Sequence, residues 1–161
     1  MFDSIVIATD GSAHGDRALE LARSLLRDET ARLTVVHVVE LVGGKGGVYP
    51  RAADEDLRRT RVTSQVEALG KAGVSAEFLT PAIRLGGPAH VIAEIAESLK
   101  ADLIVVGSRG HSLISKVVLG SVPIRLLQVA PCPVLVVPLP DASGPSPALD
   151  AQESTAGVAP S

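Results

Sequence analysis

Short apolar runs alternate along this chain with segments of helical periodicity. Most of the runs are rich in valine and isoleucine, and they lack the polar alternation of a strand with one face in water. Strands buried on both faces belong to a parallel sheet covered by helices. The runs are Ser4–Thr9, Leu33–Val39, Ala76–Thr80, Leu103–Val106 and Val134–Val137. The alternation predicts an α/β fold, an open doubly wound five-stranded parallel sheet with helices on both faces.

The segments between these runs carry apolar residues at helical spacing. Helices are expected over about residues 14–27, 53–72 and 122–130, and from Pro88 onward after Gly86-Gly87. Leu41–Ala53 interrupts the pattern with four glycines and a proline. Because this segment is too long for a simple connection, we expect a mobile loop there.

Composition and charge restrict the partners of such a domain. Hydrophobic residues make up 46% of the 161 residues and aromatic residues only 2%, and the net charge is −3. Residues 139–161 contain three acidic and no basic residues, so residues 1–138 are balanced. A neutral domain with few aromatic side chains lacks the basic stripe and stacking platforms of nucleic-acid binders. We expect no nucleic-acid partner.

The two parts of the chain differ in character. Residues 1–138 contain all the apolar runs and are expected to form one domain. Residues 139–161 are rich in Pro, Ala and Ser without apolar periodicity, which predicts a disordered tail. No run approaches the roughly 18 apolar residues of a membrane span, and the N-terminus lacks a signal-peptide pattern. The sequence thus predicts a cytoplasmic protein without membrane contact.

Glycines follow the fourth apolar run in a spacing that suits phosphate. Gly107-Ser108-Arg109-Gly110 is followed by nine residues and then by Gly120-Ser121, where a helical pattern begins. Glycine allows backbone N–H groups to approach an anion, and a helix N-terminus directs unpaired N–H groups at it. The alternative is that the glycines only turn the chain and that Ser121 is an ordinary N-cap.

Asp10 ends the first apolar run as Gly107 ends the fourth. In a doubly wound sheet, ligands lie beyond the carboxyl ends of the strands where the winding reverses. The first and fourth strands are the expected neighbours there, so Asp10 and Gly107 should face one crevice. The alternative role for Asp10 is an Asx-turn or a helix N-cap.

These motifs together resemble the universal stress protein family in its ATP-binding branch. The resemblance covers about residues 1–138 and rests on residues 5–12, Gly86-Gly87-Pro88, 101–107, the glycine motif and 130–137. It implies the strand order 3-2-1-4-5 and a homodimer that pairs through the strand Val134–Val137.

The resemblance also implies an adenine-nucleotide site and the role of each residue in it. Asp10 would bind the ribose hydroxyls, the backbone of Val38 would meet the adenine edge, and the glycine motif would hold the phosphates of ATP. The alternative for Val38 is plain strand core. The candidate nucleotide-binding residues are Asp10, Val38, Gly107, Arg109, Gly110, Gly120, Ser121 and Val122.

One residue differs from the pattern of the ATP-binding branch, so a second ligand remains an alternative. Pro123 stands where the ATP-binding members usually offer Ser or Thr, and it removes an N–H and a hydroxyl that could bind phosphate. A proline here resembles family members that bind cyclic AMP (cAMP). The alternatives are therefore a cAMP buffer or sensor and a nucleotide-free dimeric interaction module.

No catalytic set can be assembled from the sequence. No acidic residue beside the glycine motif is a candidate water-activating base, so we expect a nucleotide-dependent stress-response switch rather than an enzyme, with at most slow hydrolysis. Any Mg²⁺ would be held mainly by the phosphates, and the four histidines lack metal-ligand spacing. His37 is expected to be a hydrogen-bonded core histidine, and Cys132 a small buried hydrophobic residue. The sequence does not identify a downstream protein partner.

Overall fold

A computed structural model describes most of the predicted domain. The described residues are 1–39, 41–44, 47–50, 54–83, 86–109 and 119–138. The predicted tail, residues 139–161, lies outside them, as do Gly110 and residues 111–118 of the glycine motif.

The centre of the fold is a five-stranded parallel sheet with the order β5-β2-β1-β6-β7. Its strands are β1 (Ser4–Ala8), β2 (Arg32–Val36), β5 (Ser75–Leu79), β6 (Leu103–Gly107) and β7 (Val134–Val137). Numbered along the chain, this is the order 3-2-1-4-5, so the predicted fold class and strand order are confirmed. The prediction succeeded because the central strands are covered on both faces and therefore have apolar residues on both sides. Every residue of β1 and β6 is buried.

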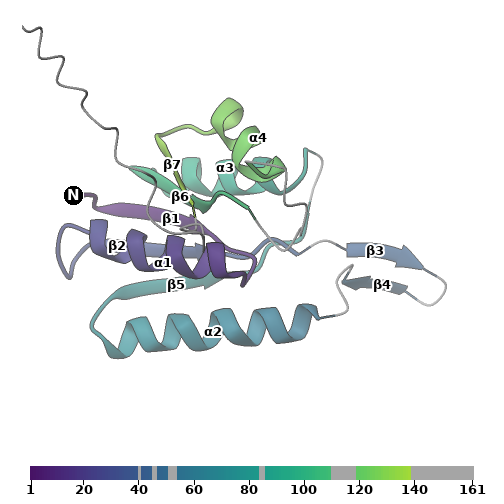
Figure 1. Cartoon of the computed structure of the whole chain (residues 1–161), viewed down its shortest axis with the longest axis horizontal. Coiled ribbons are helices and arrows are strands. Elements are labelled where there is room, and N and C mark those ends of the chain that lie inside the picture. The colour runs from purple at the N-terminus through teal and green to yellow at the C-terminus, as the bar shows by residue number, and fades with distance from the viewer. Residues whose placement is uncertain (40, 45–46, 51–53, 84–85, 110–118, 139–161) are drawn as a thin grey trace, which may run out of the picture.

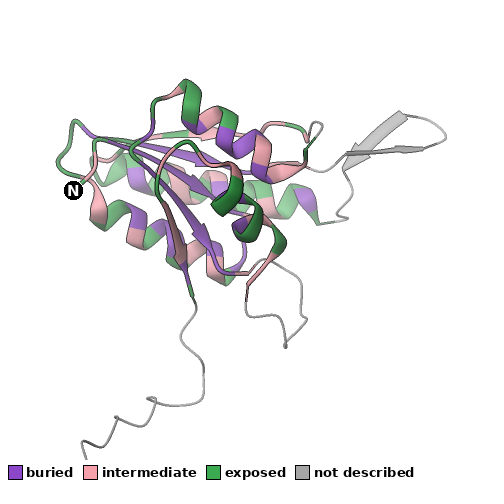
Figure 2. Ribbon diagram, turned by 90° about the horizontal axis from the view of Figure 1, so that it is seen from above, coloured by how far each residue is buried: buried purple, intermediate pink, exposed green. Residues whose placement is uncertain are grey.

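Helices cover both faces of the sheet (Figure 1). They are α1 (Ala13–Leu25), α2 (Glu55–Lys71), α3 (Pro88–Ser98) and α4 (Ser121–Val129). Helices α1 and α2 pack on one face around Ile5, Ile7 and Val35. Helices α3 and α4 pack on the other face around Val6 and Ile104. Figure 2 shows the resulting pattern, with buried strands between helices that are buried along one side only.

The prediction of a loop over Leu41–Ala53 is wrong for two stretches. Strands β3 (Leu41–Gly44) and β4 (Gly47–Pro50) pair antiparallel, with Leu41 opposite Pro50, in a two-stranded sheet separate from the main one. Val42, Val48 and Tyr49 are strong strand formers, and glycines between such residues favour a hairpin as well as a loop. Residues 45–46 and 51–53 of this segment lie outside the described residues.

Candidate nucleotide-binding site

Two segments far apart in the sequence lie side by side at the carboxyl edge of the sheet. Strands β1 and β6 are parallel neighbours, with Ala8 opposite Val106. Asp10 and Ser108 therefore each lie two residues beyond this matched pair, Asp10 after β1 and Ser108 after β6. The winding reverses between these strands, because β1 has β2 on its other side and β6 has β7. This is where open α/β sheets bind ligands.

The loop after β1 is fixed by its own hydrogen bonds. The Gly11 N–H donates to Thr9 Oγ1 at 3.1 Å, and the Ser12 N–H donates to Asp10 Oδ1 at 3.0 Å. Ser12 is the N-cap of α1, where its Oγ accepts from the Gly15 N–H at 3.3 Å. The alternative that Asp10 forms an Asx-turn is therefore present in the structure. A carboxylate has about four acceptor positions, so this turn and a ribose contact are compatible in number.

Helix α1 lies so close to Gly107 that only glycine fits at this position. A Cβ at this position would lie 2.8 Å from His14 Cβ and 2.9 Å from the His14 carbonyl carbon. The first turn of α1 thus packs directly on the end of β6, and no side chain fits between them. The structure accounts for this glycine by packing, independently of any phosphate.

The start of α4 is joined to the end of β6. The Gly120 N–H donates to the Ser108 carbonyl at 2.8 Å, and the Ser108 N–H donates to the Val137 carbonyl at 2.8 Å. The N-cap of α4 is Gly120, so the alternative that Ser121 is the N-cap is wrong. Ser121 and Val122 are the first helical residues, and first-turn N–H groups have no acceptor within their own helix.

Two residues near the start of α4 affect the number of hydrogen-bond donors available there. Pro123 is buried as the third residue of α4, where it provides no N–H. Arg109 is half-buried, and its Nε is buried without a hydrogen-bond partner in the described part of the chain. Gly110, the other predicted phosphate-binding glycine after β6, lies outside the described residues.

Val38 lies two residues beyond β2 and is half-buried against the core on the side of α3. Its neighbours pair with the segment after β5: the His37 N–H donates to the Leu79 carbonyl and the Val39 N–H to the Pro81 carbonyl, both at 2.9 Å. The backbone N–H of Val38 alternates with these and faces the β1 side. The structure thus brings Asp10, Gly107, Ser121 and Val38 to one edge of the sheet.

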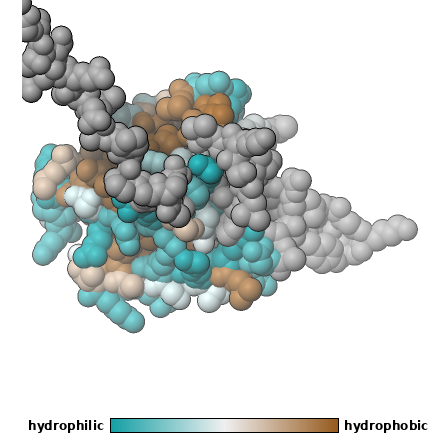
Figure 3. All heavy atoms as spheres, in the orientation of Figure 1, coloured by the Kyte–Doolittle hydropathy of each residue, from teal (hydrophilic) through white to brown (hydrophobic). Residues whose placement is uncertain are grey.

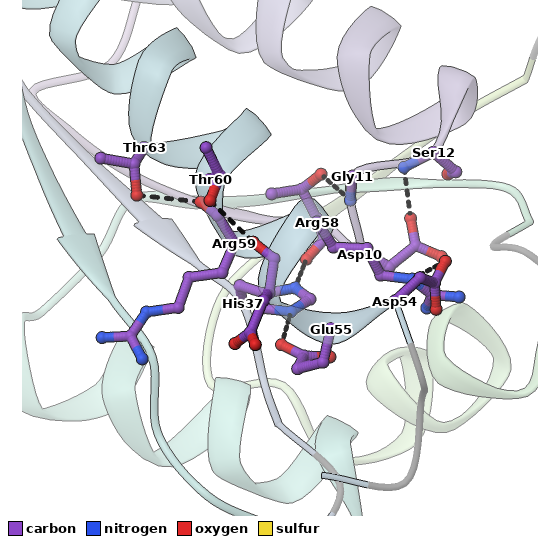
Figure 4. Close-up of polar contacts among 12 residues, drawn as sticks. Asp10, Gly11, Ser12, His37, Asp54, Glu55, Arg58, Arg59, Thr60 and Thr63 are labelled. Atoms are coloured by element: carbon purple, nitrogen blue, oxygen red, sulfur yellow. Dashed lines mark hydrogen bonds and ion pairs between the residues drawn. The ribbon is translucent and has the colours of Figure 1, made fainter.

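His37 is a hydrogen-bonded core histidine, as predicted, with 3% of its surface exposed. Its Nδ1 lies 2.9 Å from the Thr9 carbonyl oxygen, and its Nε2 lies 2.6 Å from Glu55 Oε1 (Figure 4). Glu55, the first residue of α2, is only 8% exposed and was not among the candidate residues. No sequence signal separates it from the neighbouring acidic residues Asp54 and Asp56.

The first turn of α2 also lies against the loop after β1. The Cα of Arg58 is 3.6 Å from the position of a Cβ built on Gly11, which has a φ of +74°. Arg58 Nε donates to Asp54 Oδ2 at 3.0 Å, and Figure 4 shows this pair beside Asp10. Elements α1, α2, β1, β2, β6 and α4 all contribute to the same edge.

Comparison with known proteins shows the family of this chain. The model of the Universal stress protein family matches residues 1–138. A universal stress protein of Thermus aquaticus is 37% identical over 139 residues, which cover 85% of this chain and 99% of that protein.

Two solved structures of universal stress proteins hold an adenine nucleotide. A structure in complex with cAMP is 27% identical with a TM-score of 0.58, and the alignment covers 84% of this chain and 97% of that one. The protein from Archaeoglobus fulgidus in complex with dAMP is 28% identical with a TM-score of 0.59, over 83% of this chain and 96% of that one. This chain belongs to the universal stress protein family.

Proposed function

We propose that this protein binds an adenine nucleotide, ATP, at the carboxyl edge of its sheet and acts as a nucleotide-dependent switch. The observation that carries the proposal is the bond from Gly120 to Ser108, which joins the start of α4 to the end of β6. Strand β6 is the neighbour of β1, and the loop after β1 carries Asp10. One segment offers a fixed carboxylate and the other offers first-turn N–H groups. The cAMP and dAMP complexes of related proteins support an adenine nucleotide as the ligand.

Each part of the nucleotide has a candidate partner. Asp10 accepts hydrogen bonds from the ribose hydroxyls, and the backbone of Val38 contacts the adenine edge. The N–H groups of Ser121 and Val122, together with Arg109, bind the phosphates, and Gly110 and Gly120 let the backbone approach them. Gly107 contributes by letting α1 pack against the end of β6 beside the phosphates.

Any Mg²⁺ is bound mainly by the phosphates of ATP. The described residues contain no group of three His, Cys, Asp or Glu side chains that could hold a metal, and Mg²⁺ commonly keeps phosphate and water ligands. We propose a binding protein with at most slow hydrolysis.

A second candidate ligand is cAMP, favoured by Pro123. The proline leaves two N–H groups, those of Ser121 and Val122, in the first three residues of α4. Fewer donors suit the single phosphate of cAMP better than the three phosphates of ATP, and a related protein is known in complex with cAMP.

The switch would act through a homodimer paired along β7. Strand β7 is an edge of the sheet, and Val134, Leu135 and Val136 are only half-buried. Ile124 and Leu127 on α4 are 46% and 59% exposed, and Figure 3 shows hydrophobic side chains gathered over this helix. An unpaired edge strand with apolar neighbours favours pairing with a second copy. Among the described residues, no helix is both long and apolar enough to cross a membrane.

Calorimetric titration of nucleotide-stripped protein tests the proposal. We expect saturable binding of ATP with Mg²⁺ and weaker binding of cAMP. Displacement of ATP by lower concentrations of cAMP would instead favour the second candidate. If neither nucleotide produces heat or a thermal shift, the protein is an interaction module without nucleotide and the proposal is wrong.

A further inference from the structure

His37 uses both ring nitrogens, and its two partners come from other elements. Nδ1 lies 2.9 Å from the Thr9 carbonyl oxygen at the end of β1, and Nε2 lies 2.6 Å from Glu55 Oε1 at the start of α2. A carbonyl oxygen can only accept, so Nδ1 carries a proton. The contact with Glu55 needs a second proton, on either Nε2 or the carboxyl group.

The bond to Thr9 stands where the sheet ladder would have continued. The Thr9 N–H donates to the Val36 carbonyl at 3.0 Å, so the next ladder bond would run from the Val38 N–H to the Thr9 carbonyl. The imidazole of His37 donates to that carbonyl instead. Within the described part of the chain, the Val38 N–H donates to no backbone carbonyl.

The bond to Glu55 extends the same contact to α2. Glu55 begins this helix, and one turn later Arg58 lies against Gly11 of the loop after β1. The pair therefore joins three segments: the end of β1 before Asp10, the end of β2 before Val38, and the first turn of α2. Both side chains are buried, so neither bond is exchanged for water without opening this region.

We infer that His37 and Glu55 are positioning residues for the nucleotide site. The imidazole ends the ladder between β1 and β2, which keeps the Val38 N–H available to the adenine edge and fixes the loop that carries Asp10. Glu55 holds the imidazole in the orientation that does this. The inference rests on the proposed function, because it assigns these residues to the site of the adenine and the ribose.

Three variants separate positioning from simple packing. Glu55→Gln keeps the geometry, because the amide can donate to Nε2 while Nδ1 still donates to Thr9. Glu55→Ala removes the contact. Asp56→Ala is the matched control, since it removes an exposed acidic residue from the same helical turn.

Two measurements are made on each full-length variant. Titration with ATP is expected to show binding weakened about tenfold in Glu55→Ala, the order of one lost hydrogen bond, and nearly unchanged binding in Glu55→Gln and Asp56→Ala. Amide hydrogen exchange is expected to be faster over residues 9–12 and 37–39 in Glu55→Ala only.

The outcomes are distinguishable. Unchanged exchange over these residues in Glu55→Ala overturns the inference whether or not a nucleotide binds. Faster exchange with unchanged ATP affinity overturns the positioning role while leaving the proposed function intact. If the wild-type protein binds neither ATP nor cAMP, the proposed function fails and the positioning role fails with it.

Discussion

The backbone N–H of Gly120 donates to the carbonyl oxygen of Ser108 at 2.8 Å. Twelve positions separate the two residues in the chain, and this bond places the start of α4 at the end of β6. Because β6 is next to β1 in the sheet, the same bond brings α4 to the edge that carries Asp10. The candidate site depends on this connection.

Gly107→Ala is expected to destabilise the protein by about 1–3 kcal/mol, the usual cost of an added methyl group in a packed region. The new Cβ would lie within 3 Å of backbone and Cβ atoms of His14, which cannot move without shifting α1. Denaturant unfolding measures the change. Gly70→Ala in α2 is the control: a Cβ there meets no atom within 4 Å apart from its chain neighbours and the backbone of its own helix, and the variant should be stabilised by about 0.5–1 kcal/mol. Equal stability of the two variants would contradict the close contact.

Asp10→Asn and Asp10→Ala should differ in stability but not in binding. The asparagine carbonyl can still accept from the Ser12 N–H, so the Asx-turn is retained, whereas alanine removes it. Both variants lack the carboxylate proposed to bind the ribose, and ATP affinity should fall about tenfold or more in each. Thermal unfolding and calorimetry measure the two effects separately. Full ATP affinity in Asp10→Asn would exclude the proposed contact of the carboxylate with the ribose.

Much of the fold can be predicted from the sequence because burial on both faces produces unbroken apolar runs. The runs that became β1 and β6 were identifiable in this way. The hairpin of β3 and β4 was not, because its glycines obscure the strand-forming residues Val42, Val48 and Tyr49.

The same distinction applies to the candidate site: residues that end apolar runs can be predicted, and residues placed by tertiary packing cannot. Asp10 and Gly107 could be predicted because they end apolar runs that become neighbouring strands. Glu55 could not, because an acidic residue in the first turn of a helix is usually exposed, and only tertiary packing brings it to His37. The close contact of Gly107 with His14 is likewise absent from the local sequence pattern.

Val136→Pro is expected to prevent dimerisation without unfolding the monomer. In β7 the inward-facing groups bond to β6, as shown by the donation of the Ser108 N–H to the Val137 carbonyl, and the parallel ladder leaves the Val136 N–H on the outer edge. Proline removes this N–H and is tolerated on edge strands. Analytical ultracentrifugation should find a monomer.

Leu135→Pro is the contrasting variant. It removes an N–H that faces β6 and should lower the free energy of unfolding by about 3 kcal/mol or more. A dimer that persists in Val136→Pro would exclude pairing through the edge of β7.

Cys132 should react slowly with alkylating reagents near neutral pH. Burial, with a smaller contribution from the nearby negative charge of Asp102, raises the pKa of the Cys132 thiol, and the thiolate is the reactive form. Its alkylation rate should therefore rise with pH at higher values than for a free cysteine. Asp102→Asn removes the charge and should lower the pKa and speed alkylation at a given pH. Stopped reactions analysed by mass spectrometry give the rates, and an unchanged rate in Asp102→Asn would exclude the electrostatic contribution.

The most direct test of the proposed site is an NMR titration of the amide signals with ATP and Mg²⁺. The amides of Thr9–Ser12 and those of Ser121 and Val122 should shift together, saturably, with one dissociation constant, because a single nucleotide contacts both segments. Shifts confined to one of the two segments, or two different dissociation constants, would contradict a common site between Asp10 and the start of α4.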